Sequence, residues 1–124
     1  MKQVVDFLSE LSINNNKEWF DGHKDQYVKA LAQFHTFTEQ LIDGIASFHK
    51  EIGNLSIKDC TYRIYRDLRF SKDKTPYKTH MGAYICPGGK KSGQAGYYFH
   101  LEPGTKNKSS NHFMASGLWH PAPG

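Results

Sequence analysis

One short stretch of the chain concentrates the side chains that could bind or transform a ligand. Between Arg63 and His80 lie six Lys or Arg residues and two acidic ones, so this segment holds the whole formal net charge of +4. The rest of the chain has equal numbers of basic and acidic residues. A charge excess confined to one segment indicates an anionic partner more sharply than a high isoelectric point spread over the chain.

The residue types in this segment suit a ligand that carries phosphate or carboxylate groups. Arginine presents a planar fork that matches the oxygens of such groups, and lysine adds movable point charges. Tyrosines placed between these cations can stack on nucleotide bases. We therefore predict that the domain binds a phosphorylated small molecule or a nucleic acid. The predicted binding residues are Arg63, Arg66, Arg69, Lys72, Lys74, Tyr77, Lys78 and His80.

Three other interpretations of the segment stay open. An enzyme acting on a phosphorylated or nucleotide substrate would use the cations to stabilise developing negative charge, with Asp67 or Asp73 as the base. Alternatively, the charges form a structural ion-pair network with the N-terminal helices. Its acidic partners would be Glu18, Asp21 or Asp25. Finally, an apolar patch near Trp119 together with a defined dimer would indicate a protein-interaction module. The sequence does not indicate the oligomeric state.

Seven histidines raise the question of a metal site. His80, His100 and His112 lie on or beside predicted strands, but the chain has none of the spacings HxH, HExxH or CxxC. The glycine- and lysine-rich residues 88–93 lack the GxxxxGK[ST] order of a phosphate loop. We predict no metal and no cofactor, and we expect the histidines to be hydrogen-bonded or solvent-facing.

Two kinds of periodicity divide the chain into a helical first half and a stranded second half. Apolar residues recur every three or four positions over residues 3–11 and 23–49, and a helical turn fits residues 17–22. β-branched and aromatic residues then dominate four stretches: residues 61–65, 81–86, 95–101 and 112–116. This predicts a single α+β domain over residues 1–124, with one long helix packed on a mainly antiparallel meander of about four strands.

Strand alternation divides the basic segment into a buried and a presented face. Ile64, Leu68 and Phe70 fall on the face expected to join the core, and Arg63 and Arg69 fall on the other. Residues 71–76 then form a polar loop that ends at a rigid proline. Binding residues collect on loops of this kind because a rigid scaffold holds them in place.

Three motifs resemble a known family. They are Asn14-Asn-Asn-Lys-Glu-Trp-Phe20, Arg63-Ile-Tyr-Arg-Asp-Leu-Arg-Phe-Ser-Lys-Asp-Lys-Thr-Pro-Tyr-Lys78 and Gly96-Tyr-Tyr-Phe-His-Leu-Glu-Pro103. Together they resemble the uncharacterised proteins of the domain of unknown function 2461 (DUF2461), over nearly the whole chain. The family has no established activity, substrate or cofactor, so the resemblance implies no catalytic residue. Its members continue past the position of Trp119, which suggests that this chain is the N-terminal part of a longer family domain.

The sequence also indicates a compartment. Acidic residues interrupt the short apolar stretch at the N-terminus, and we find no apolar run long enough to cross a bilayer. Without a secretion signal, Cys60 and Cys86 are expected to be reduced thiols. We therefore expect a cytoplasmic protein with no membrane partner.

Overall fold

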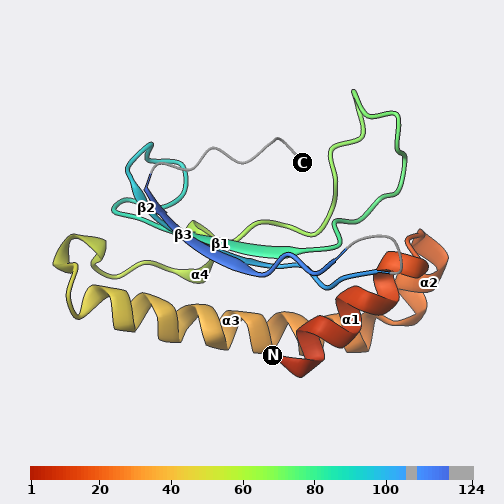
Figure 1. Cartoon of the computed structure of the whole chain (residues 1–124), viewed down its shortest axis with the longest axis horizontal. Coiled ribbons are helices and arrows are strands. Elements are labelled where there is room, and N and C mark those ends of the chain that lie inside the picture. The colour runs from red at the N-terminus through yellow and green to blue at the C-terminus, as the bar shows by residue number, and fades with distance from the viewer. Residues whose placement is uncertain (106–108, 118–124) are drawn as a thin grey trace.

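The computed structural model describes residues 1–105 and 109–117. Its helices are α1 (Lys2–Ile13), α2 (Lys17–Gly22), α3 (Lys24–Ala46), the 3-10 helix η1 (Lys50–Ile52) and α4 (Ile57–Cys60). Its strands are β1 (Met81–Ile85), β2 (Gly96–Leu101) and β3 (Phe113–Gly117). Figure 1 shows α1 and α3 lying against one face of the sheet, which confirms the predicted α+β class. Within the described ranges, no helix has both the length and the apolar character needed to cross a membrane.

The helices form where the apolar spacing predicts them. α1 buries Val4, Phe7, Leu8 and Leu11 along one stripe. Asn16 precedes α2, and its side chain caps the helix by accepting a hydrogen bond from the backbone N–H of Trp19 at 2.8 Å. The long helix α3 ends at Ala46, three residues before the predicted end, and the chain then turns through η1.

The short helix α4 lies outside the helices that periodicity predicts. A capping box starts it: the Asp59 N–H donates to the Ser56 hydroxyl, and the Ser56 N–H donates to the Asp59 carboxylate. The Ser-x-x-Asp pattern is visible in the sequence, but four residues are too few to show an apolar stripe. A local capping signal was therefore the only available clue.

The sheet is an antiparallel meander with the order β1-β2-β3. Met81 pairs with Leu101, and His100 pairs with Phe113, so the predicted antiparallel meander is confirmed for these strands. Alternate residues face opposite layers: Met81 and Ala83 join the core beneath the helices. On the other face, which we call the outer face, a separate buried cluster is built from Tyr84, Cys86 and Tyr98, with Tyr62 and Phe113 packed against it.

In the described residues the sheet has three strands, and the prediction of about four was wrong. Residues 61–65 run antiparallel to residues 77–83 but make only two isolated bridges, Thr61 with Ala83 and Tyr65 with Tyr77. Six residue steps separate the two partners in the second segment, whereas four separate them in the first. This mismatch in length prevents a continuous ladder of hydrogen bonds, because regular pairing needs equal steps on both strands.

Gly96 offers a test of the packing at the start of β2. A Cβ atom at this position would overlap the Ile85 carbonyl oxygen and the Cys86 side chain. We expect Gly96→Ala to lower the free energy of unfolding by about 1–3 kcal/mol, because backbone atoms must shift. Urea unfolding followed by circular dichroism measures the change. The matched control is Gly44→Ala in α3, where nothing lies within 4 Å of the added atom; an equal loss in both variants would contradict the argument.

Candidate functional site

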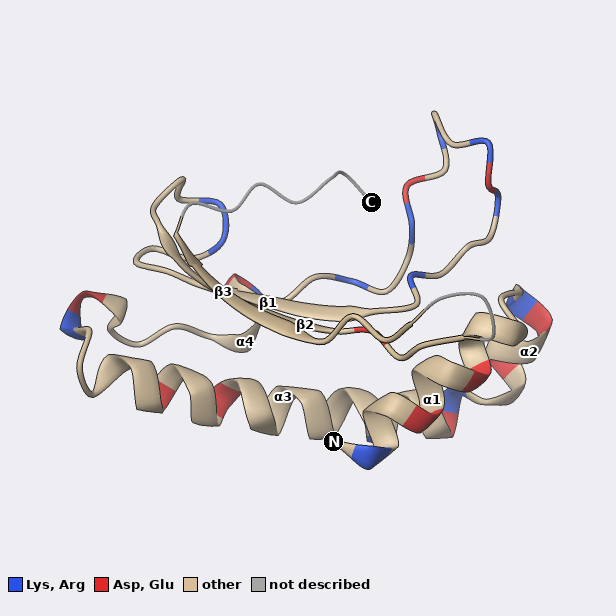
Figure 2. Ribbon diagram, in the orientation of Figure 1, with Lys and Arg blue, Asp and Glu red and all other residues tan. Residues whose placement is uncertain are grey.

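The basic segment forms a loop that stands on a short antiparallel base. The Arg66 N–H donates to the Pro76 carbonyl at 2.9 Å, and the Lys78 N–H donates to the Ile64 carbonyl at 2.8 Å. Residues 67–75 extend from this base and project away from the helices, as Figures 1 and 2 show. Figure 2 also shows basic residues along this loop and several acidic residues on α1 and α3. We call residues 67–75 the basic loop.

Asn15 and Phe20 anchor this base to the helical layer. The Asn15 side chain donates to the Tyr77 carbonyl at 2.8 Å and accepts from the Tyr77 N–H at 3.1 Å, as a paired strand residue would. The Tyr77 ring stacks on Phe20 with centroids 4.1 Å apart and an interplanar angle of 16°. Tyr77, a predicted binding residue, is only 3% exposed, so its ring lies in the core.

Arg66 belongs to the base, but its side chain reaches into the basic loop and holds the two sides of the loop together. Its guanidinium donates to the Thr75 carbonyl at 2.9 Å, to the Thr75 hydroxyl at 2.7 Å and to the Ser71 hydroxyl at 3.1 Å. It also lies 3.4 Å from the Asp73 carboxylate. Because the loop itself satisfies most of its donors, Arg66 has little capacity left for a ligand.

The two carboxylates proposed as bases are also engaged. Asp67 accepts from Arg69 in a bidentate pair, with Oδ2 2.7 Å from Nη2. Hydrogen bonds from Arg69 lower the pKa of Asp67 to about 2. Asp73 accepts from the backbone N–H and the hydroxyl of Thr75, and these bonds lower its pKa as well. Carboxylates with low pKa values are weak bases at neutral pH, so this geometry does not favour acid–base catalysis by either residue.

The predicted alternation of faces breaks down in the basic loop. Ile64 is buried as predicted, but Phe70 is 95% exposed, so its prediction as a core residue was wrong. Its backbone lies beyond the antiparallel base, where the chain no longer follows the sheet and strand alternation no longer applies. The ion pairs of Arg66 and Arg69 lie within the loop; in the described part of the chain, no ion pair joins them to the acidic residues of α2 or α3.

Arg63 and Lys78 lie at the base of the loop and, unlike Arg66 and Arg69, form no ion pair among the described residues. Burial and the neighbouring Arg63 charge lower the pKa of Lys78. Among the described residues, neither cation has a carboxylate within ion-pair distance. The Lys78 ammonium lies 5.8 Å from the centre of the Tyr62 ring, and the Lys90 ammonium lies 5.7 Å from the same centre. Sequence reasoning missed Lys90, because it compared residues 88–93 only with a phosphate loop, and no sequence spacing connects Lys90 with Tyr62.

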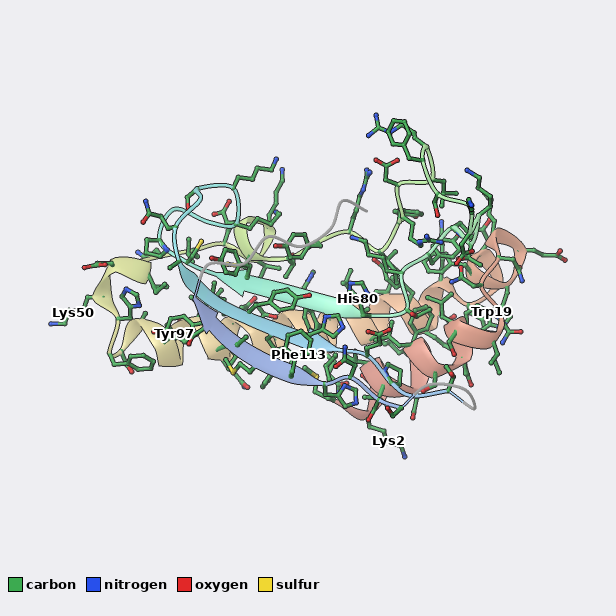
Figure 3. The ribbon with its side chains drawn as sticks, turned by 45° about the horizontal axis from the view of Figure 1, so that its top comes forward. Lys2, Trp19, Lys50, His80, Tyr97 and Phe113 are labelled. Carbon is green, nitrogen blue, oxygen red and sulfur yellow. The ribbon has the colours of Figure 1, made fainter. Side chains whose placement is uncertain are left out.

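The remaining predicted residues separate into two places. Lys72 and Lys74 lie exposed on the basic loop, where the Lys74 ammonium donates to the Leu68 carbonyl at 2.7 Å. His80 lies before β1 and stacks on His100, with ring centroids 4.6 Å apart. Figure 3 shows His80 and Phe113 on the outer face of the sheet. The structure therefore places Arg63, Lys78 and His80 near the sheet and the other predicted cations along the loop.

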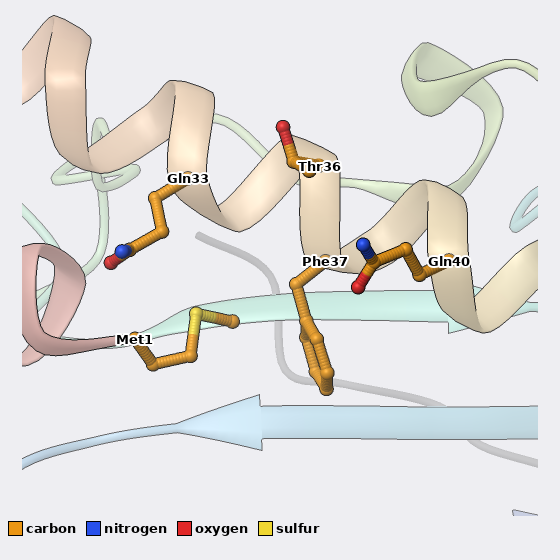
Figure 4. A pocket seen from close by; sticks show the side chains of 5 residues that line it. All are labelled: Met1, Gln33, Thr36, Phe37 and Gln40. Carbon is orange, nitrogen blue, oxygen red and sulfur yellow. The ribbon is translucent and has the colours of Figure 1, made fainter.

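The surface also has a hollow that lies apart from the predicted binding residues. It measures about 350 Å³ and is lined by Met1, Gln33, Thr36, Phe37 and Gln40, on the side of α3 drawn in Figure 4. Its lining has amide and hydroxyl groups but no charged side chain. The side chains that line the hollow therefore bring no charge to a phosphate group.

The fold and the site define a class of protein in which helices cover one face of a small antiparallel sheet and a basic loop projects beyond the other. Over residues 3–124 the chain matches the family described as "Conserved hypothetical protein (DUF2461)", and it therefore belongs to that family. The family is uncharacterised, and the match confirms the resemblance seen in the three motifs. Comparisons with the curated proteins and with the solved structures found no match. The proline-rich end that contains Trp119 lies outside the described residues.

The pairing of Asn15 with the Tyr77 backbone can be tested directly. Asn15→Ala removes both hydrogen bonds to a buried residue, and we expect a loss of about 1–3 kcal/mol in the free energy of unfolding. Urea unfolding gives the value. Asn14→Ala is the control, because the Asn14 side chain makes an exposed bond to the Glu10 carbonyl. If the two variants were equally stable, the anchoring role of Asn15 would be refuted.

The state of Asp67 gives a second test. An NMR titration should find its carboxyl pKa near 2, and Arg69→Ala should return it toward the ordinary value of 3.8. Because the folded-state pKa is depressed, the ion pair contributes fully to folding stability above pH 3.8. It loses this contribution as the pH falls through about 2. The Asp73 carboxyl serves as an internal control and should keep its pKa in the variant. An unchanged Asp67 titration in Arg69→Ala would exclude the pairing.

Proposed function

We propose that the protein binds a phosphorylated small molecule through Arg63 and Lys78, at the base of the basic loop. The observation that carries this proposal is the proximity of two cations, neither of which has a carboxylate within ion-pair distance among the described residues. Hydrogen bonds from Arg69, the bidentate partner of Asp67, are the main cause of the low pKa of that carboxylate, and the Arg63 charge adds a smaller contribution. Two like charges near one another, one of them partly buried, cost free energy. An anion bound between them would offset that cost.

The chemistry of the neighbouring groups supports a phosphate ligand. The Arg63 guanidinium supplies a fork for two phosphate oxygens, and the Lys78 ammonium supplies a point charge. Lys90 adds a third positive charge beside Tyr62, although its ammonium also donates to the Lys58 carbonyl at 2.7 Å. Three cations suit one or two phosphate groups better than a long polyanion, which is why we favour a small ligand over a nucleic acid.

The engagement of Arg66, Arg69, Asp67 and Asp73 supports binding rather than catalysis at this site. These residues hydrogen-bond or pair with one another and with the loop backbone. In our proposal they hold the loop, while Arg63 and Lys78 contact the ligand. Lys72 and Lys74 would add long-range attraction from the loop, since exposed charges steer anions at low salt.

Titration with pyrophosphate and with mononucleotides, in EDTA and at low salt, tests the proposal. We expect Arg63→Gln and Lys78→Gln each to weaken binding by about 10- to 100-fold, the range for a lost charge-assisted hydrogen bond. Lys29→Gln is the matched control, because this exposed lysine lies on α3 in the layer opposite the outer face. Its affinity should equal that of the wild type.

Two outcomes would redirect or end the proposal. Tight binding of single-stranded nucleic acid alone, with affinity falling as about the second power of the salt concentration for three contacts, would assign a polymeric ligand to the same cations. Absence of binding to every anion at low salt would refute it, as would equal affinity in the wild type and the double variant of Arg63 and Lys78.

A further inference from the structure

Three potential metal ligands meet on the outer face, where the segment before β1 lies beside the end of β2. One ligand atom from each of His80, His100 and Glu102 lies within 4.8 Å of the other two. Imidazole nitrogen and carboxylate oxygen together form a common donor set for zinc. We propose that these three residues bind a divalent transition-metal ion, with zinc as the best fit. This site goes beyond the proposed anion binding and does not depend on it.

His100 is held in an orientation suited to a ligand. It is only 8% exposed, and its ring stacks on Phe113 with centroids 4.8 Å apart and an interplanar angle of 19°. Its Nδ1 atom lies 2.8 Å from the Tyr98 hydroxyl. Histidines that bind metals through one nitrogen usually hydrogen-bond through the other, which fixes the ring. The Tyr98 hydroxyl oxygen can accept a hydrogen bond from Nδ1–H, because a phenol oxygen accepts as well as donates.

Backbone packing makes room for Tyr98. Its ring lies over Gly82, where an added Cβ atom would lie 3.1 Å from the Tyr98 Cζ atom. Gly82 pairs with His100 in the ladder between β1 and β2, so the glycine, the tyrosine and the histidine form one packed unit. The orientation of His100 is therefore set by the sheet register and by the absence of a side chain at Gly82.

Glu102 supplies the negative charge of the site. Its carboxylate lies 2.9 Å from His100 Nε2, and the side chain is 13% exposed. Its backbone is held at both polar groups: the N–H donates to His112 Nδ1 at 3.0 Å, and the carbonyl accepts from the Asn111 N–H at 2.8 Å. A hydrogen bond between Nε2 and the carboxylate holds the pair together. When a metal ion takes the place of the Nε2 proton, the neutral ring carries its one proton on Nδ1, which donates to the Tyr98 hydroxyl.

His80 is the ligand that must move. Zinc bonds of about 2.1 Å in a tetrahedron put ligand atoms roughly 3.4 Å apart, so the His100 and Glu102 atoms are already near the required separation. The His80 and His100 rings lie at 23° to each other, and the lone pairs of nearly parallel rings do not converge on one point. We therefore expect the half-buried His80 ring to rotate on binding. A fourth position remains for water or an exchangeable ligand.

The test uses untagged protein that has been freed of metal by EDTA and dialysed into buffer without phosphate. Calorimetric titration with Zn²⁺ should show one equivalent, and Co²⁺ should give the absorption bands of a tetrahedral site. His80→Ala and Glu102→Gln should each weaken Zn²⁺ binding by at least about 10-fold, since ligands matter no less than their outer-shell partners. Tyr98→Phe should weaken it by about 10-fold and leave the Co²⁺ bands in place, because Tyr98 only orients His100.

The chain contains a matched control. His49 also has a glutamate at Nε2, Glu51 at 3.4 Å, and a tyrosine hydroxyl at Nδ1, Tyr97 at 3.3 Å, but these groups form no cluster of three metal ligands in the described ranges. His49→Ala should bind Zn²⁺ as the wild type does. Glu102→Gln preserves side-chain volume, and circular dichroism should show whether the variant is folded. No Zn²⁺ binding by the folded wild type, or unchanged affinity in both His80→Ala and Glu102→Gln, would overturn the proposal.

Discussion

The pairing of Asn15 with the backbone of Tyr77 joins the two halves of this fold. A side-chain amide takes the place of a neighbouring strand, satisfies both polar groups of a buried residue and fixes the segment that leads into β1. Phe20, from the helix that Asn16 caps, then stacks on the Tyr77 ring. The base of the basic loop therefore owes its position to the helical layer, and the residues that follow it inherit that position along the chain.

The same anchoring explains why the cations of one short segment have different roles. Arg66 and Arg69 lie where the loop can fold back on itself, so nearby carbonyls, hydroxyls and carboxylates satisfy them. Arg63 and Lys78 lie at the base, where the backbone is engaged in antiparallel pairing and where neither cation forms an ion pair among the described residues. Charge that is internally paired stabilises a loop, whereas charge that is not paired attracts a partner. Both kinds occur here within a few residues.

The side chains that could bind ligands gather on the outer face because the helices cover only the other side of the sheet (Figure 1). An antiparallel sheet can leave its second face to polar and aromatic side chains. Here that face has its own buried cluster around Tyr84 and Tyr98, and His100 belongs to the same surface. Tyr98 therefore has two roles, since its ring packs in this cluster and its hydroxyl orients His100. The proposed anion and metal sites are neighbours on this surface, with Lys78 and His80 two residues apart.

The α+β class, the three main helices, the meander and the family could all be predicted from the sequence, because apolar periodicity and motif identity are local properties. The number of strands and the make-up of both candidate sites depend on contacts between distant segments. Residues 61–65 do not form a fourth strand because four residue steps separate Thr61 from Tyr65, whereas six separate Tyr77 from Ala83. This mismatch cannot be seen in either segment alone. No sequence spacing predicts that His80 lies beside His100 and Glu102, because strand register brings together side chains twenty residues apart. Charge counting located the cations, but only three-dimensional contacts separated Arg66, which braces the loop, from Arg63, which does not.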